Sequence, residues 1–428
     1  METASRSKER RYFRFDNAAH IYPAIKSRKQ PGVFRVSATL SEQVDPKTLQ
    51  ASVDATLKRI PGFAVKLRKG LFWNYFVHSS DTLHIQPDVI NPCTEITRRV
   101  NDGFLLRVRY HRCEIALEIF HALADGTGAM VFLKTLVADY LKRKGIEIPA
   151  ENGILDCDET ARPEEVADSF RPFAGGAHVL RREEPRAYQI TGTEIPPQDI
   201  IITRGTIQTS ELSQAAKSLN ASITEYLTAV LMYTLNCRQL QEAPYHMQPV
   251  RIQVPVNLRT FFETQTLRNF SSFINVGLEP RLGNYTFEEV ITLVHHFLRY
   301  EVNEKFLRSR VAANLRTEGT FFLRIVPLVI KTPMIGLGYK RAGPRTFTSI
   351  ISNLGNVEVP DAMSNHIDRF DFILGASYDT KVKCAVAGFK GDLVITFTRS
   401  IEEASVERAF FTFLVEQGIP VEIESNQE

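Results

Sequence analysis

The amino-acid sequence predicts an α/β protein that is built as two lobes with a similar order of elements. Both halves of the chain alternate period-2 strand patterns with amphipathic helical stripes. The stretch between them, residues 151–199, is rich in proline and charge and shows little periodicity. We therefore expect an N-terminal lobe over residues 1–150, a crossover linker over 151–199 and a C-terminal lobe over 200–428, each lobe combining a mixed β-sheet with helices.

The first lobe is expected to begin with a strand followed by a capped helix. The β-branched and apolar run from Val33 to Leu40 is typical of a strand. Asp45-Pro46 then opens a helix that continues to about Arg59, because aspartate caps helices well and proline fits their first turn. Two further strands are expected over 64–68 and 71–77.

A β-hairpin and a helix follow, and a histidine lies between them. Residues 106–111 and 113–119 alternate apolar with polar side chains, which is the pattern of two half-buried strands. His121 continues the phase of the apolar positions in the second strand, so we expect its side chain on the buried face if the strand geometry persists that far. From Thr127 the spacing becomes helical, and the basic residues before Gly145 mark the end of that helix.

The second lobe shows a fresh series of strand and helix patterns. Period-2 patterns predict strands over 200–207, 250–256, 273–278, 349–352, 371–378, 383–389 and 392–398. Helical stripes predict helices over 210–219, 224–235, 287–307 and 405–417. The similar element order suggests a pseudo-duplicated architecture, although no sequence repeat accompanies it.

Composition and charge restrict the classes of partner. Hydrophobic residues make up 43% of the 428 residues and charged residues 24%, which is an ordinary globular balance. The 52 basic and 49 acidic side chains leave a net charge of +3, too small for nucleic acid to be the main partner. The basic segment from Arg6 to Arg14 has no apolar run behind it, so we interpret it as a solvated tail and not as a secretory signal.

The cysteines and the most apolar long segment indicate the cellular compartment in which the protein is expected. The five cysteines lie far apart, with no Cys-x-x-Cys pair and no Cys/His cluster, so we expect free thiols and no metal site. The apolar segment over 321–339 contains Arg324, Lys331 and two prolines, which makes it a poor transmembrane candidate. The sequence therefore predicts a cytoplasmic protein without a membrane span.

The most informative motif is Phe120-His121-Ala122-Leu123-Ala124-Asp125-Gly126, at the junction of the predicted strand and helix. It supplies an imidazole, a carboxylate that can organise the local backbone and a glycine that permits a turn, which together suit general-base chemistry. The residues also have ordinary structural interpretations. A histidine at a strand end can be a satisfied core residue, and Asp-Gly is a common turn or helix cap.

This motif resembles the His-x-x-x-Asp-Gly signature of the CoA-dependent acyltransferase superfamily, which includes chloramphenicol acetyltransferase, plant acyltransferases and the condensation domains of peptide synthetases. Residues 254–259, 269–276 and 349–355 are similar to further segments of the superfamily, in the expected order. The opening residues 14–19 resemble the start of the bacterial alcohol acetyltransferase branch. The resemblance implies two pseudo-symmetric chloramphenicol-acetyltransferase-like lobes with the active-site channel between them.

The resemblance also implies roles for the matched residues. His121 matches the catalytic general base, which takes a proton from the acceptor and returns it to the leaving thiolate without an acyl-enzyme. Asp125 matches an aspartate that points away from the substrate and forms an ion pair with an arginine, for which Arg259 is the matching position. Gly126 matches the glycine that allows the tight turn and leaves room for the channel.

Three more positions enter through the resemblance. Ser352 or Asn353 could donate a hydrogen bond to the tetrahedral oxyanion, although both are also ordinary turn residues. Phe120 stands where many members carry a first histidine that is often not the base, and an apolar side chain there would reshape one wall of the channel. Arg259 also has an ordinary interpretation as a surface-loop arginine.

The resemblance implies an acyl-CoA-dependent O-acyltransferase that acts on a small-molecule alcohol, with an amine as the second class of acceptor and acetyl-CoA as the favoured donor among acyl-CoAs. No bound cofactor is expected, because the acyl-CoA is a co-substrate. Two alternatives stay open: a non-catalytic member that only binds a ligand or carrier protein, and a condensation-like domain whose donor is an acyl carrier protein thioester. The plant-type Asp-Phe-Gly-Trp-Gly segment is absent, and His295-His296 is interpreted as a helix face.

Overall fold

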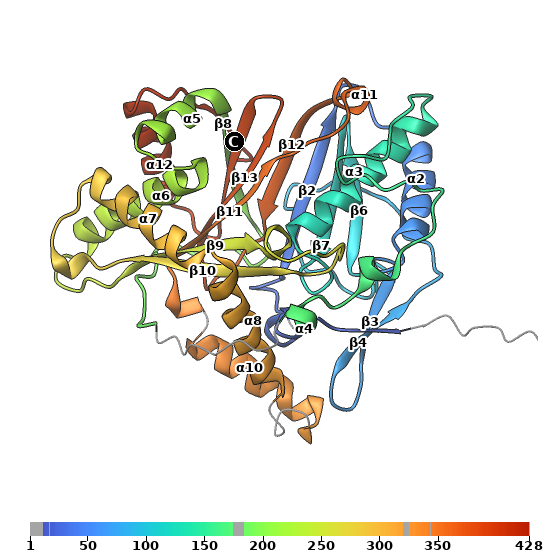
Figure 1. Ribbon diagram of the computed structural model, residues 1–428, viewed down its shortest axis with the longest axis horizontal. Helices are drawn as coiled ribbons and strands as arrows, with labels where there is room; N and C mark the ends of the chain where they lie inside the picture. The colour runs from blue at the N-terminus through green and yellow to red at the C-terminus, as the bar shows by residue number, and fades with distance from the viewer. Residues whose placement is uncertain (1–11, 17, 174–183, 320–324, 343, 428) are drawn as a thin grey trace, which may run out of the picture.

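The chain folds into two lobes that lie side by side, as the computed structural model in Figure 1 shows. The structure describes residues 12–16, 18–173, 184–319, 325–342 and 344–427. The basic tail before Tyr12, part of the expected linker and the start of the apolar segment over 321–339 therefore lie outside the described residues. The mixed α/β fold with two lobes is confirmed.

The first lobe is built on a five-stranded mixed sheet with the strand order β12-β2-β7-β6-β5. Its strands are β2 (Val33–Leu40), β5 (Gln86–Pro87), β6 (Leu106–His111), β7 (Glu114–Phe120) and β12 (Ile367–Leu374). Neighbouring strands are antiparallel except β5 and β6. The hairpin predicted over 106–119 is β6 and β7.

Two helices, α2 (Pro46–Arg59) and α3 (Gly126–Arg143), pack together on this sheet. Both begin at an aspartate whose carboxylate accepts a hydrogen bond from a backbone N–H in the first turn, Asp45 in α2 and Asp125 in α3. The apolar side of α3 is buried in the first core, together with Ile115, Leu117 and Ile119 of β7.

The second lobe contains a seven-stranded mixed sheet with the order β10-β9-β11-β13-β14-β8-β15. Its strands are β8 (Ile201–Gln208), β9 (Val250–Asn257), β10 (Ser271–Leu278), β11 (Ser349–Asn356), β13 (Val382–Phe389), β14 (Asp392–Arg399) and β15 (Glu422–Ser425). The helices on its outer side in Figure 1 are α5 (Thr209–Ser218), α6 (Ile223–Glu242), α7 (Phe287–Glu301) and α12 (Ser405–Glu416). A second core lies between these helices and the sheet.

Smaller elements close one end of the molecule. A three-stranded sheet has the order β1-β4-β3, and short helices and two longer ones, α8 and α10, lie near it in Figure 1. These elements are β1 (Tyr12–Arg14), β3 (Val65–Lys69), β4 (Asn74–His78), α1 (Tyr22–Ile25), α4 (Phe170–Phe173), α8 (Glu304–Gly319) and α10 (Leu328–Ala342). The short helix α11 (Asp361–Ser364) lies at the opposite end in Figure 1, next to β12. None of the helices within the described ranges has the length and apolar character needed to cross a bilayer.

Several predicted element boundaries are wrong, and the strands expected over 71–77 and 349–352 are in fact Asn74–His78 and Ser349–Asn356. The helix expected over 287–307 is two helices, because it ends at Glu301 and Asn303 Oδ1 accepts from Phe306 N at 3.0 Å, which caps a new helix. The strand expected over 371–378 is β12, whose bounds follow its pairing with β2. The helix expected over 224–235 continues to Glu242.

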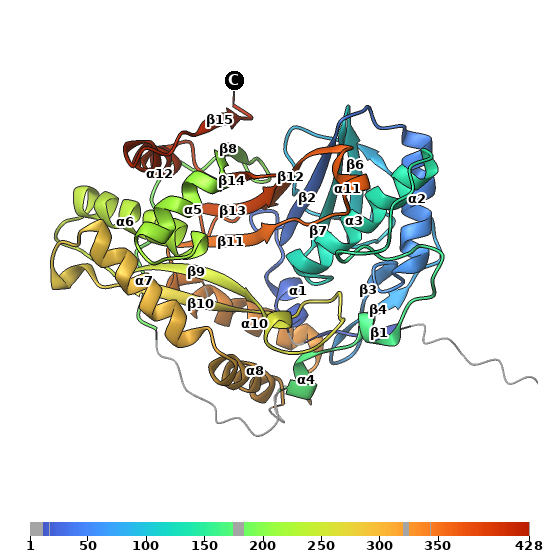
Figure 2. The same ribbon diagram turned by 45° about the horizontal axis from the view of Figure 1, so that its top comes forward.

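The first sheet obtains one edge strand from the second half of the chain. β12 pairs antiparallel with β2 along Phe34 to Leu40, and it also contacts β13 and β14 of the second lobe. Figure 2 shows β12 between the two sheets. The division at residues 150 and 199 remains a proposal for the lobes, and β12 crosses it.

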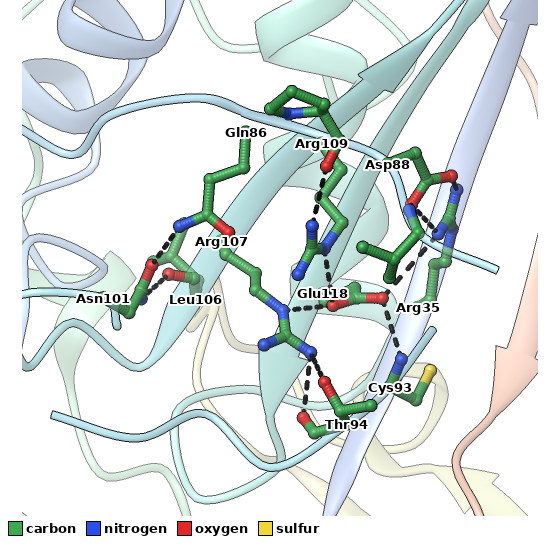
Figure 3. A network of polar contacts seen from close by, with 12 residues as sticks. Arg35, Gln86, Asp88, Cys93, Thr94, Asn101, Leu106, Arg107, Arg109 and Glu118 are labelled. Atoms are coloured by element: carbon green, nitrogen blue, oxygen red, sulfur yellow. Dashed lines mark hydrogen bonds and ion pairs between the residues drawn. The ribbon is translucent and has the colours of Figure 1, made fainter. Parts of the chain in front are cut away.

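A buried ionic network fixes the other side of β7 (Figure 3). The Glu118 carboxylate is fully buried and accepts hydrogen bonds from Arg107, from Arg109 Nε at 3.4 Å and from the backbone N–H of Cys93 at 2.8 Å. Arg35 Nη1 lies 3.7 Å from the same carboxylate. Glu118 thus shares its single negative charge among three buried guanidinium groups and attaches the segment around Cys93 to the sheet.

Candidate active site

His121 lies directly after β7, in an aromatic setting. The strand ends at Phe120, and the backbone N–H of His121 donates to the Gly32 carbonyl at 2.8 Å. The imidazole stacks on the ring of Tyr22, with centroids 4.6 Å apart and planes 11° from parallel, and its edge faces Phe34 at 5.1 Å. The ring is therefore held in one plane by two neighbours.

The amide of Asn269 sets the tautomer of His121. Asn269 Oδ1 lies 3.2 Å from His121 Nδ1. Because an amide oxygen only accepts, a hydrogen bond in this contact requires the tautomer with the proton on Nδ1 and the lone pair on Nε2. Burial lowers the pKa of His121 below its usual 6.5, while the charge of Asp125 and the contact with Asn269 oppose the shift. A neutral imidazole with a free Nε2 lone pair can act as a base.

Both carboxylate oxygens of Asp125 accept hydrogen bonds, from backbone N–H groups and from an arginine. Its Oδ1 accepts from Gly128 N at 3.0 Å, which caps α3. Its Oδ2 accepts from Arg259 Nη1 and from Phe270 N, each at 2.8 Å. The ion pair that the resemblance implies between Asp125 and Arg259 is present in the structure.

Arg259 organises the loop that connects β9 to β10. Its Nε donates to the Thr266 carbonyl at 2.9 Å, and its Nη2 donates to the Arg268 carbonyl. Asn269 follows in the same loop. The guanidinium therefore links Asp125 at the start of α3 to the residue that contacts His121, through hydrogen bonds that fix the loop on both sides.

Two glycines at the start of α3 allow the second lobe to approach. A Cβ at Gly126 would lie 2.8 Å from Leu354 Cδ2, so this glycine leaves room for the end of β11. A Cβ at Gly128 would lie 2.0 Å from the carbonyl oxygen of Leu267, a contact that no flexible side chain could relieve. The glycine at 128 is thus required by the loop that carries Asn269.

Ser352 and Asn353 lie near the end of β11, and the structure distinguishes them. Asn353 Nδ2 donates to Thr224 Oγ1 of α6 at 3.0 Å, and its Oδ1 accepts from Gly355 N at 2.7 Å. Both ends of the Asn353 amide are therefore hydrogen-bonded within the protein. Ser352 pairs with Ala385 of β13, which belongs to the first core, whereas Ile351 belongs to the second. Ser352 therefore faces the first lobe, because side chains alternate along a strand.

Phe120 packs into the first lobe beside the site. Its ring is buried, forms an edge contact with Tyr22 and lies 5.2 Å from Lys26 Nζ. Gly32 has a φ of +66°, and a Cβ there would lie 3.2 Å from the Phe120 ring. In the structure Phe120 supports the segment that receives the His121 N–H, and its effect on a channel wall remains a proposal.

Sequence reasoning missed three polar groups around this site. Asn269 was matched only as the start of a similar segment. Lys383 donates to the Gly375 carbonyl at 2.7 Å, burial lowers its pKa to about 8, and its charge lowers the pKa of His121. Burial raises the pKa of Asp16 to about 6, and its carboxylate lies 3.4 Å from Arg268. Gly126-x-Gly128 was a signal that another segment approaches the start of the helix, since two glycines in one helical turn are unfavourable unless a close contact requires them, but it does not identify the approaching residues.

Within the described ranges, no group of three His, Cys, Asp or Glu side chains is arranged to hold a metal ion. His295 lies on α7 with its Nδ1 3.4 Å from Glu225, away from the His121 motif in the chain. The candidate site is therefore His121, Asn269, Asp125, Arg259 and Ser352.

Replacing Arg259 by alanine should lower both the melting temperature and the rate of turnover. The substitution leaves Asp125 without its ion-pair partner and frees the loop carbonyls, which should cost about 3 kcal/mol of unfolding free energy. The measurements are thermal unfolding and thiol release. Arg281→Ala is the matched control, because Arg281 forms an exposed ion pair with Glu279. Unchanged rate and melting temperature in Arg259→Ala would remove the positioning role.

Comparison with known proteins supports the fold assignment. No protein-family model matches the chain, and no curated protein sequence matches it. Among solved structures, TRI101 of F. graminearum complexed with coenzyme A and T-2 mycotoxin is 10% identical, with 97% of this chain and 99% of that chain covered and a TM-score of 0.65. The trichothecene 15-O-acetyltransferase TRI3 from Fusarium sporotrichioides is 12% identical, with 94% and 93% covered and a TM-score of 0.58.

A condensation domain is similar as well. The starter condensation domain of rhizomide synthetase RzmA, a mutant in complex with C8-CoA and Leu-SNAC, is 11% identical, with 94% of each chain covered and a TM-score of 0.61. At these identities the likeness concerns the fold alone. The resemblance noted in the sequence is confirmed at this level: the chain has the same fold as TRI101, TRI3 and the RzmA condensation domain.

Proposed function

We propose that this protein is an acyl-CoA-dependent acyltransferase in which His121 is the general base. The observation that carries the proposal is the chain of contacts from Asp125 through Arg259 and its loop to Asn269, which places an amide oxygen against His121 Nδ1 and so favours the tautomer with an unprotonated Nε2. A histidine with only a packing role does not need this arrangement. Structural neighbours crystallised with coenzyme A or an acyl-CoA support the donor class.

The proposed reaction is a direct transfer. His121 Nε2 accepts the proton of the acceptor hydroxyl while the hydroxyl oxygen attacks the thioester carbonyl, forming the C–O bond and a tetrahedral oxyanion. The Ser352 hydroxyl donates a hydrogen bond to that oxyanion. The intermediate collapses, the C–S bond breaks, and protonated His121 returns the proton to the thiolate of coenzyme A. Asp125, Arg259 and Asn269 are positioning residues.

We propose an alcohol as the acceptor class, with an amine second, and acetyl-CoA as the favoured donor. An O-acetyltransferase among the structural neighbours supports this choice. The channel between the lobes, the cytoplasmic location and the bacterial alcohol acetyltransferase branch stay predictions. A carrier-protein donor remains the alternative, since condensation domains share the fold.

The test is thiol release from acetyl-CoA and longer acyl-CoAs against a panel of alcohols and amines, with calorimetric titration of coenzyme A in parallel. Acceptor-dependent release would support the proposal and give the acyl and acceptor classes. Binding of coenzyme A without release from any pair would favour the non-catalytic alternative. Neither binding nor release would contradict the acyl-CoA donor, and a carrier-protein thioester would then be tried.

The pH dependence of kcat/KM should show an acid limb with its inflection below 6.5. Burial lowers the His121 pKa, so the folded enzyme keeps its base neutral to a lower pH than an unfolded chain would. By linkage, this group's contribution to stability is present above pH 6.5 and is lost as pH falls from 6.5 through the folded pKa.

The profile is measured over about pH 5 to 8, the range in which histidines titrate. Asn269→Ala should move the inflection further down, because the Asn269 contact raises the His121 pKa. An inflection at or above 6.5 in the unaltered protein would contradict the assignment of His121 as the titrating base.

A further inference from the structure

Helix α10 presents its apolar side outward. Val329 is 86% exposed, and Ile330, Met334 and Leu337 are each more than half exposed. At 100° per residue these positions, with Pro333 among them, fall on one continuous face of the helix. Surface helices normally turn such a face toward the core, so this helix is inverted.

The side of α10 that faces the protein holds a buried charge. Lys331 is buried, its Nζ donates to the Phe72 carbonyl at 2.8 Å, and it lies 3.3 Å from the centroid of the Trp73 ring. A cation–π contact and a carbonyl thus satisfy the lysine inside, while valine and leucine face water. Folding alone gives no reason for this orientation, because rotation of the helix would bury the apolar side chains.

The turn of the β3–β4 hairpin extends the same apolar surface. Leu71 is 71% exposed and Phe72 is 38% exposed, and the Leu71 carbonyl accepts from Leu328 N at 2.8 Å. In Figure 1 this hairpin and α10 project together at the bottom of the molecule. We call this surface the apolar tip. Its members are Leu71, Phe72, Ile325, Val329, Ile330, Met334 and Leu337.

The chain around the apolar tip contains basic residues and no acidic ones. No Asp or Glu occurs from residue 55 to 80 or from 319 to 357, whereas each stretch holds five Lys or Arg residues, of which Arg59 and Lys331 are buried and Lys66 pairs with Asp81. Arg68 and Lys69, next to the hairpin turn, are exposed. Exposed apolar side chains with basic neighbours are complementary to a surface that offers hydrocarbon under a layer of negative charge.

We propose that the apolar tip docks onto an anionic lipid bilayer. The apolar side chains would insert at the boundary between headgroups and acyl chains, and the basic residues would lie among anionic headgroups. No helix has to cross the bilayer for this. An apolar partner protein would not require the acid-free segments on both sides of the tip, which favours lipid.

The apolar tip is connected to the candidate site through α1. Helix α10 packs against α1, and Gln30 Nε2 donates to Tyr339 Oη at 3.3 Å. Tyr22 of α1 is the residue that stacks on His121. Docking would therefore bring the site close to the lipid surface, and, resting on the proposed function, an alcohol dissolved in lipid is the acceptor class that this geometry favours.

The test is co-sedimentation of the full-length protein with vesicles of phosphatidylcholine alone or mixed with phosphatidylglycerol. Val329→Ser with Leu337→Ser removes apolar contact, and Arg68→Gln with Lys69→Gln removes charge. The control is Tyr245→Ser with Leu282→Ser, because these apolar side chains on the second lobe are at least as exposed, at 93% and 80% against 86% for Val329 and 53% for Leu337.

We expect the unaltered protein and the control to bind the anionic vesicles, and the apolar double variant to lose at least about tenfold in partition coefficient. The basic double variant should lose the preference for anionic lipid. Absence of vesicle binding, or binding unaffected by the apolar double variant, would overturn the proposal. A dimer that this variant dissociates in sedimentation velocity, without vesicle binding, would assign the tip to a second copy. Vesicle binding does not depend on catalysis. The docking proposal can therefore hold even if the thiol-release assay contradicts the proposed acyltransferase function.

Discussion

Replacement of His121 by alanine should reduce acceptor-dependent thiol release by about 10²- to 10⁴-fold, the usual contribution of a positioned general base. The expected effect is on kcat, because the lost group acts on the proton that moves in the transition state. The measurement is steady-state thiol release with the best donor and acceptor pair. Binding of coenzyme A should be retained, since in the proposed mechanism His121 meets coenzyme A only at its thiolate sulfur.

His246→Ala is the matched control for this variant, because His246 is an exposed histidine in the second lobe. Circular dichroism and thermal unfolding would show that both variants are folded. Equal release in the unaltered protein and in His121→Ala would remove His121 from the mechanism. Loss of release together with loss of the fold would call for His121→Gln, which keeps the side-chain volume closer to that of histidine.

Glu118→Gln should be the most destabilising conservative substitution in the first lobe. The glutamate is fully buried. Removing its negative charge leaves the positive charges of Arg107, Arg109 and Arg35 less well compensated in the apolar interior. Breaking a buried ion pair from one side costs about 3–5 kcal/mol of unfolding free energy. The measurement is urea unfolding at neutral pH, compared through the midpoint and the slope.

Glu114→Gln provides the comparison, because Glu114 lies on the same strand and also pairs with Arg35, but its side chain is 27% exposed. Partly exposed pairs contribute about 0–1 kcal/mol. If both variants lost the same free energy of unfolding, the network around Glu118 would not have the role assigned to it. A much larger loss of unfolding free energy for Glu118→Gln would show that the ionic network in Figure 3 stabilises the first lobe.

Local chemistry explains which elements the sequence could predict. The bounds of β2 and α2 follow from a β-branched run and from Asp45-Pro46, and both agree with the structure. The position of β12 depends on its pairing with β2, and the break before Asn303 depends on a competing cap. Such effects come from residues outside the window in which periodicity is measured.

The candidate site divides in the same way. His121, Asp125 and Gly126 form a contiguous motif and could be found from spacing. Asn269 acquires its role only because Arg259 folds the loop onto α3, and the need for glycine at 128 comes from the Leu267 carbonyl. The resemblance supplied Arg259, but no local pattern in the sequence points to Asn269.

The origin of β12 has a consequence for the order of folding. Phe370 pairs with Ala38, so one edge of the first sheet is closed by a strand that emerges from the ribosome more than three hundred residues after its partner. Until then the free side of β2 exposes unpaired backbone N–H and C=O groups, which can pair with the wrong strand or with another nascent chain. Completion of the first lobe therefore has to wait until about three quarters of the second lobe has been made, and synthesis of this protein should depend on chaperones that shield an open sheet edge.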